Sequence, residues 1–137
     1  MSGDGPTGDG LPPLLEFAYW GDLAGVSDCV ARGEALEVTD ELGSTALILA
    51  AVQDHANCVT VLLEAGADAA ARTDYGDTAL SLAAANGHLD VVRTLLLGGA
   101  DPGTTGSNGP TAIEFAQEQG HENVVEFIES WGSDPST

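Results

Sequence analysis

Three histidines, His55, His88 and His121, follow one another at equal intervals of 33 residues in this 137-residue chain. Imidazole is a frequent ligand of zinc, so a metal site is the first chemistry to consider. Many other columns of the sequence share this interval, which indicates that the histidines occupy equivalent places in stacked units. Packed helices lie about 10 Å apart, which is too far for side chains in such places to share one metal ion. We therefore expect no metal site, and we expect each histidine to cap or hydrogen-bond a neighbouring loop.

The other candidates for chemistry are two cysteines, a glycine-rich segment and many carboxylates. Cys29 and Cys58 have no CxxC spacing and align with Leu, Ile and Val of the other units, so we expect small core residues. The segment GGADPGTTGSNGP (98–110) lacks the GK[ST] ending of a phosphate loop. No pattern indicates the apolar cleft that a catalytic carboxylate pair requires. An enzyme or small-ligand site would need converging polar groups, and we expect neither an enzyme nor a cofactor.

The charge of the chain is strongly one-sided. It contains 22 Asp and Glu against 3 Lys and Arg, and its formal net charge is -19. Such a field repels nucleic-acid phosphates and anionic membranes, so we expect neither as a partner. It is compatible with a basic protein partner. It is equally compatible with a surface adapted to high salt, in which case the partner-binding surface lies elsewhere.

The N-terminal segment and the hydropathy of the chain bear on where in the cell the protein is located. The N-terminal MSGDGPTGDG lacks the basic start and apolar core of a signal peptide. No apolar run approaches the length of a membrane span. We expect a cytoplasmic protein, with a nuclear or organellar location left open, and a monomer when alone.

The interval of 33 residues is an internal repeat. Its columns include Gly33, Gly66, Gly99 and Gly132; Gly43, Gly76 and Gly109; Thr45, Thr78 and Thr111; and Val26, Val59, Val92 and Val125. Each unit reads as a helix that begins near Thr, a turn, a second apolar helix that ends before Gly, and an extended loop. Because one helix pair cannot bury its apolar face alone, the units must stack.

This pattern resembles the ankyrin repeat over about residues 11–132. The matching text is DELGSTALILAA (40–51), YGDTALSLAAANGHLDVVRTLLLGGAD (75–101) and NGPTAIEFAQEQGHENVVEFIESWGSD (108–134). The resemblance implies an all-α ankyrin-repeat solenoid of four stacked helix-turn-helix units with extended finger loops, of the small stand-alone type. The expected parts are an N-terminal tail (1–10), a repeat domain (11–132, in units of about 11–39, 40–72, 73–105 and 106–132) and a C-terminal tail (133–137).

Two departures from the family pattern concern the start of each first helix. The family proline after Thr is Ala in all three full units. The family histidine of the same motif is Ile48, Ser81 and Glu114. We therefore expect the hydrogen bond between the Thr and that histidine to be missing, with some loss of rigidity.

Tyr19 and Trp20 lie in columns that are otherwise small or polar, at the end of a first helix. The resemblance implies that this column and the finger tips line a concave groove that binds a protein partner. The residues expected there are Tyr19, Trp20, Glu41, Leu42, Ser44, Val52, Gln53, Asp74, Tyr75, Asp77 and Asn86. Aromatic anchors among polar groups suit an interface. The alternative for Trp20 is that it folds back onto the first unit as cover.

Overall fold

The computed structural model describes residues 12–103 and 110–132. The expected tails, and the tip of the finger before the last helix pair, lie outside these ranges. The described residues contain eight helices and no strand, only an isolated bridge between Arg72 and Thr78. The helices are α1 (Pro13–Trp20), α2 (Leu23–Ala31), α3 (Ala46–Val52), α4 (Ala56–Glu64), α5 (Ala79–Ala85), α6 (Leu89–Leu97), α7 (Ala112–Glu118) and α8 (Glu122–Gly132).

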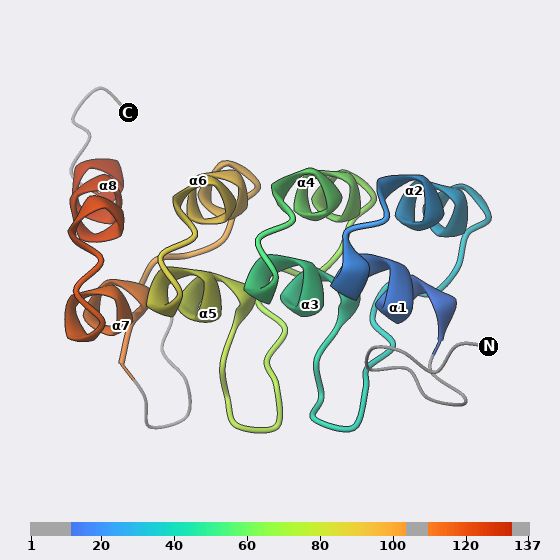
Figure 1. Ribbon diagram of the computed structural model, residues 1–137, viewed down its shortest axis with the longest axis horizontal. Coiled ribbons are helices and arrows are strands. Elements are labelled where there is room, and N and C mark those ends of the chain that lie inside the picture. The colour runs from blue at the N-terminus through green and yellow to red at the C-terminus, as the bar shows by residue number, and fades with distance from the viewer. Residues whose placement is uncertain (1–11, 104–109, 133–137) are drawn as a thin grey trace.

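The helices form two parallel rows (Figure 1). One row contains α1, α3, α5 and α7, and the other contains α2, α4, α6 and α8, with each helix packed on the next one of its own row. Consecutive helices such as α1 and α2 pack across the rows. Extended loops project from the first row, away from the second (Figure 1). The predicted all-α repeat solenoid with finger loops is confirmed.

The first-row helices α3, α5 and α7 begin at the threonine column, whereas α1 begins after Pro12. Thr78 Oγ1 accepts a hydrogen bond from the backbone N–H of Ser81, and Thr111 Oγ1 accepts one from Glu114. In return, Ser81 Oγ and Glu114 Oε1 accept from the backbone N–H groups of these threonines, at 3.0 and 2.9 Å. These pairs are capping boxes. The family bond from a histidine is absent here, as expected, but Ser81 and Glu114 make a side-chain bond to the threonine in its place at the start of α5 and α7.

The first-row helices end in a left-handed residue. Gly21, Gly87 and Gly120 follow α1, α5 and α7 with φ of 73°, 73° and 76°. Asp54 follows α3 with φ of 66°, and it is the one residue other than glycine with positive φ in the described ranges. Aspartate tolerates this conformation better than most residues. The turn predicted after each first helix is thus confirmed, including the place held by Asp54.

The core lies between the two rows. Alanines of the first row, such as Ala50 and Ala83, are fully buried and let the second row approach closely. Second-row residues such as Val59 fill the space opposite them. Cys29 and Cys58 are fully buried and free, which confirms them as core residues. None of the helices in the described ranges is long and apolar enough to cross a membrane.

Candidate functional site

Histidines tie the ends of the first-row helices together. His55 Nε2 donates to the carbonyl oxygen of Tyr19, and His88 Nε2 donates to that of Val52, each at 3.1 Å. Both acceptors belong to the last turn of the preceding first-row helix. The predicted hydrogen-bonding role of these two histidines is confirmed, although the acceptors are helix-end carbonyls and not loop groups. These bonds hold the backbone of Tyr19 and Val52, which are two of the residues whose side chains were predicted to contact a partner.

Two of the three histidines, His55 and His121, also pack closely against the turns that follow first-row helices. A Cβ added at Gly21 would lie 2.5 Å from His55 Nδ1, and one at Gly87 would lie 2.6 Å from His121 Nδ1. A side chain at Gly21 or Gly87 would need the histidine to shift, and the positive φ also favours glycine there. At the equivalent place before α4, the Oδ2 of Asp54 is 3.8 Å from His88 Nδ1. The histidine of each unit therefore packs against the turn of the preceding unit in an equivalent way along the stack.

Tyr19 and Trp20 form an aromatic pair at the end of α1. Their ring centroids are 5.0 Å apart and the planes are nearly perpendicular, at 87°. The Trp20 side chain is 52% exposed, whereas Tyr19 is partly buried. Half of the Trp20 surface is therefore open to solvent, as the surface prediction requires.

The first finger (residues 38–44) is organised by Asp40. Its Oδ1 accepts from the backbone N–H groups of Leu42 and Ser44, both at 2.9 Å, and its own N–H donates to the Ser44 carbonyl. Leu42 is left 53% exposed at the tip. Ser44 is only 7% exposed because it turns back toward the start of α3. We therefore leave Ser44 out of the surface considered below.

The second finger (residues 71–77) has the same closure with a different side chain. Thr73 Oγ1 accepts from the backbone N–H groups of Tyr75 and Asp77, at 3.2 and 3.3 Å. The Thr73 N–H donates to the Asp77 carbonyl at 2.9 Å. Tyr75 is 75% exposed, the most exposed of the large apolar or aromatic side chains in the described ranges. A large ring is thus presented at the tip of an ordered turn.

The two fingers are joined side by side. The backbone N–H of Asp74 donates to the carbonyl of Leu42 at 2.9 Å. The Asp74 carboxylate lies against Gly43, where an added Cβ would be 2.5 Å from Oδ1. We name Glu41, Leu42, Asp74, Tyr75 and Asp77 the finger-tip patch. The seam between the fingers places the Asp74 carboxylate against the first finger, next in sequence to the exposed Tyr75.

The carboxylates of the finger-tip patch have no basic partner. Arg32 pairs with Asp28 and Glu34, at 3.3 and 3.1 Å, and Arg93 pairs with Asp90. Both arginines belong to the second helix row or its end. Throughout residues 12–103 and 110–132, no ion pair reaches the carboxylates of the patch.

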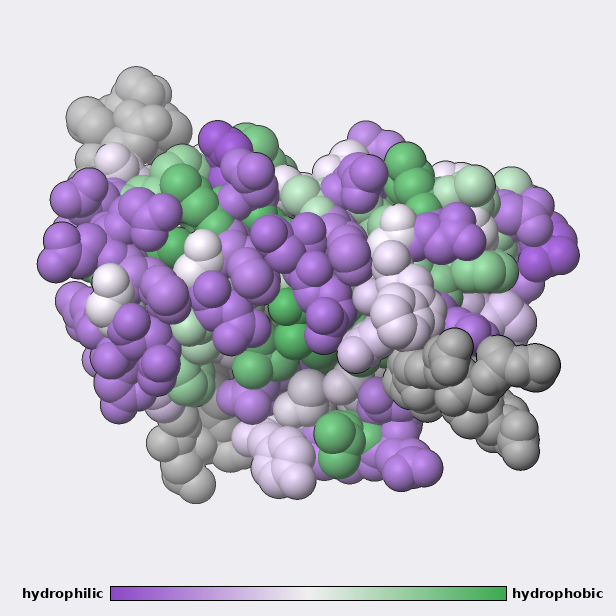
Figure 2. Space-filling model, in the orientation of Figure 1, coloured by the Kyte–Doolittle hydropathy of each residue, from purple (hydrophilic) through white to green (hydrophobic). Residues whose placement is uncertain are grey.

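The remaining predicted residues lie at helix ends. Gln53 and Asn86 are exposed C-cap residues of α3 and α5, and Val52 is partly buried. We name Tyr19, Trp20, Val52, Gln53 and Asn86 the helix-end row. The turns that follow the first-row helices are on the near side in Figure 1, and hydrophobic side chains reach this face in the middle of the helices and near the fingers, among many hydrophilic ones (Figure 2).

Leu97 is an exposed apolar residue that was not predicted as such. It ends α6 in the second row, is 70% exposed, and borders a cavity of about 230 Å³ with residues of α4. The run TLLLGG hides it, because three successive leucines suggest core positions. Its column provided the available signal, since the equivalents Ala31, Glu64 and Ser130 are small or polar.

The thiols are poor nucleophiles. Burial raises the pKa of Cys29, helped by a hydrogen bond with Glu34. Burial also raises the pKa of Cys58, with a further contribution from the negative charge of Asp22. Because the thiolate is the reactive form, raised pKa values keep both groups protonated and inert. No group of three or more His, Cys, Asp or Glu in the described part of the chain could hold a metal ion.

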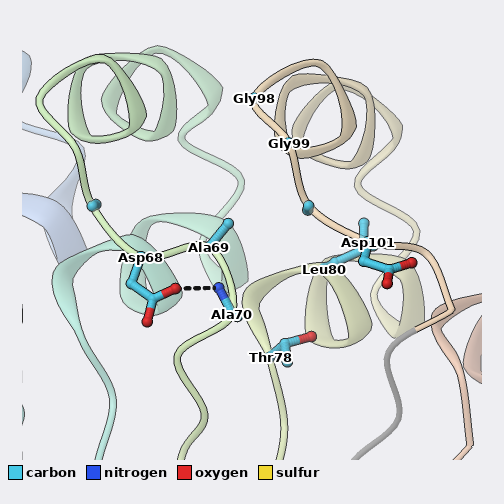
Figure 3. Close-up of a pocket in the computed structure, with 10 residues that line it drawn as sticks. Asp68, Ala69, Ala70, Thr78, Leu80, Gly98, Gly99 and Asp101 are labelled. Atoms are coloured by element: carbon cyan, nitrogen blue, oxygen red, sulfur yellow. Dashed lines mark hydrogen bonds between the residues drawn. The ribbon is translucent and has the colours of Figure 1, made fainter.

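A cavity of about 300 Å³ lies between the loops that follow α4 and α6 (Figure 3). Its polar groups are engaged locally: Asp68 Oδ1 accepts from the Ala70 N–H at 2.9 Å, and Asp101 Oδ1 accepts from the Gly103 N–H at 2.8 Å. Thr78 belongs to the capping box of α5. Much of the rest of the lining is Ala and Gly. The cavity therefore offers few free polar groups to a ligand.

Comparison with known families agrees with this architecture. A family model described as ankyrin repeats (3 copies) matches residues 14–106, which is more than half of the chain. The matched residues include α2 to α6 and all of α1 except Pro13. No curated protein matches the chain.

Proposed function

The chain belongs to the ankyrin-repeat family, and on that premise we propose that it is a non-catalytic module that binds a basic segment of a partner protein. Ankyrin repeats are generally protein–protein interaction modules, and repeat solenoids use extended concave surfaces for binding. The proposed contact surface is the helix-end row together with the finger-tip patch. The partner would lie along the stack, in contact with successive units.

One observation carries this proposal. Trp20, Leu42 and Tyr75 are each more than half exposed; Trp20 ends α1, and Leu42 and Tyr75 lie on finger turns that are held by hydrogen bonds. Exposed apolar patches with polar surroundings often mark interaction sites, and aromatic residues are enriched among interface hot spots. The carboxylates of the finger-tip patch are in no ion pair within the described residues, and they would attract a positively charged segment and speed its association.

The second candidate is that the acidity serves solubility in high salt and that the partner surface lies elsewhere. The observation that favours it is the wide distribution of acidic side chains. Exposed Glu118, Glu122 and Glu126 lie on α7 and α8, far along the stack from the first finger, and that end of the molecule is hydrophilic in Figure 2. Charge on those helices needs a reason other than the finger-tip patch.

Capture of a partner from a lysate of the source cell distinguishes the two candidates. The baits are the wild-type protein, a Trp20→Ala/Tyr75→Ala variant and a matched Leu97→Ala control, washed at about 0.05 M and about 0.5 M KCl. We expect a protein that wild type and Leu97→Ala retain, that the double variant loses, and that the higher salt weakens because the screening length falls well below 10 Å. Mass spectrometry then identifies it.

Other outcomes point away from the proposed surface. Equal retention by all three baits would place the contact elsewhere on the stack. Retention that is insensitive to salt, together with a melting temperature that rises continuously up to molar KCl, would favour high-salt adaptation as the reason for the acidity. The double variant is expected to melt close to wild type, because both substituted rings are largely exposed.

A further inference from the structure

The finger-tip patch has a composition and a rigidity that suit one particular side chain. The Tyr75 ring stands free at the tip of the second finger, and the Asp74 carboxylate is held at the seam with the first finger. The backbone bond from Asp74 N–H to the Leu42 carbonyl keeps the two tips together. An aromatic ring and a carboxylate are therefore carried by consecutive residues of one ordered finger tip.

The charge around this ring is negative and uncompensated. Glu41 and Asp77 add two more carboxylates to the patch, and the ion pairs of Arg32 and Arg93 lie on the second helix row. The third arginine of the chain, Arg72, lies at the base of the second finger, where its backbone bridges to Thr78. A cation supplied by a partner would meet a ring and carboxylates that are not already paired.

We propose that the finger-tip patch binds an arginine side chain of the partner in preference to a lysine. A guanidinium is planar, so it can stack on the Tyr75 ring while its edge donates hydrogen bonds to neighbouring carboxylates. An ammonium is a compact, strongly hydrated charge that has no flat face to stack. This inference rests on the proposed function and deepens it, because it names the chemistry of the contact at one end of the surface.

Two short peptides test the preference directly. The probes are Ac-Gly-Arg-Gly-Arg-Gly-NH2 and its lysine twin, titrated into 15N-labelled full-length protein at low salt while amide shifts are followed by NMR. We expect the largest shifts at the amides of Leu42, Asp74 and Tyr75. The arginine peptide should bind about two- to fivefold more tightly, the range of an exposed cation–π contact.

Variants then assign the preference to the ring and the charge. Tyr75→Leu keeps an apolar side chain but removes the aromatic face, so both peptides should bind it with nearly equal affinity. Asp74→Asn should weaken both peptides more than Glu126→Gln, which removes one exposed charge from α8 and leaves the fingers intact. Unchanged dispersion of the other amides shows that each variant is folded.

The results that would contradict the arginine preference differ from those that would contradict the proposed function. Equal affinities for the two peptides, an arginine preference that survives Tyr75→Leu, or shifts confined to the helix-end row would overturn the assignment of arginine to the finger-tip patch. Each of these leaves the partner-capture result standing. If wild type retains no lysate protein and neither peptide shifts any amide, the proposed function falls as well.

Discussion

The burial of a single side chain in this protein follows from the repeat column that it occupies. Cys29 and Cys58 stand where other units have leucine, isoleucine or valine, and both are buried. A buried thiol resists ionisation because the thiolate loses its hydration, so the folded state raises the pKa of each thiol above its unfolded value. The folded state therefore holds these two protons more tightly than the unfolded chain does.

That difference predicts an alkaline loss of stability. The contribution of each thiol is fully present below the unfolded pKa of about 8.5 and is lost as pH rises through the higher folded value. We expect the free energy of unfolding to fall between about pH 8 and 9.5, by at most about 1.4 kcal/mol per pH unit for each thiol. The measurement is urea unfolding across this range, below the usual ionisation of tyrosine.

The matched variant is Cys29→Ala/Cys58→Ala. It should be less stable than wild type at pH 7, because two core side chains are shortened, yet its stability should change less with pH over the same window. A pH dependence as steep as that of wild type would show that groups other than the thiols cause the alkaline loss.

Individual site residues differed in how well sequence predicted them. The exposed positions of Trp20, Leu42 and Tyr75 agree with expectation, because each lies in a turn or helix-end column of a regular repeat. Ser44 was predicted to lie on this surface but is buried. Sequence spacing does not show that the chain turns inward there. Leu97 was missed because a leucine run suggests core unless its column is compared across units.

The sequence specifies the helices mainly through the residues at their ends. Thr at the start, a left-handed residue at the end and a histidine at the start of the next helix all recur with the repeat, so helix positions could be predicted. The capping boxes also had a signal, since Thr111 and Glu114 show the T-x-x-E spacing. The bond between Asp74 and Leu42 had none, because it depends on how neighbouring units are rotated in the stack.

The loop after α4 differs from the loop after α2 at one informative place. Leu36 in the earlier loop and its equivalent Ala69 both pack against the core, but Ala69 is the shorter side chain and lines the cavity of about 300 Å³ (Figure 3). Both residues lie in turns of the same local conformation. The shorter side chain thus accounts for part of the empty space between the two loops.

Filling that space should stabilise the protein. We expect Ala69→Leu to raise the free energy of unfolding by about 0.5–2 kcal/mol, the usual gain from cavity filling. Urea unfolding measures it as a higher midpoint with an unchanged slope. The control is Ala65→Leu, at an exposed position that follows α4 and does not line the cavity, and it should give no gain. A lower midpoint for Ala69→Leu would mean that the loop cannot accommodate the larger side chain.

At the scale of the whole molecule, two helix rows and a set of fingers form a framework that presents different surfaces on different sides (Figure 1). The second row or its end carries the ion pairs of Arg32 and Arg93, together with exposed Leu97. The fingers carry exposed Leu42 and Tyr75 and carboxylates that are in no ion pair within the described residues. The repeat made the helix rows and fingers predictable from sequence, whereas the identity of a partner is not encoded in any column.

The central claim is that a partner contacts the fingers and not the second helix row, and site-specific photo-crosslinking tests it most directly. Benzoylphenylalanine would replace Leu42 in one protein and Leu97 in another, two exposed leucines on opposite sides of the first helix row. After irradiation with source-cell lysate, we predict a covalent adduct to one identified protein from position 42 and none from position 97. An adduct that forms only from position 97, or equally from both, would contradict the account.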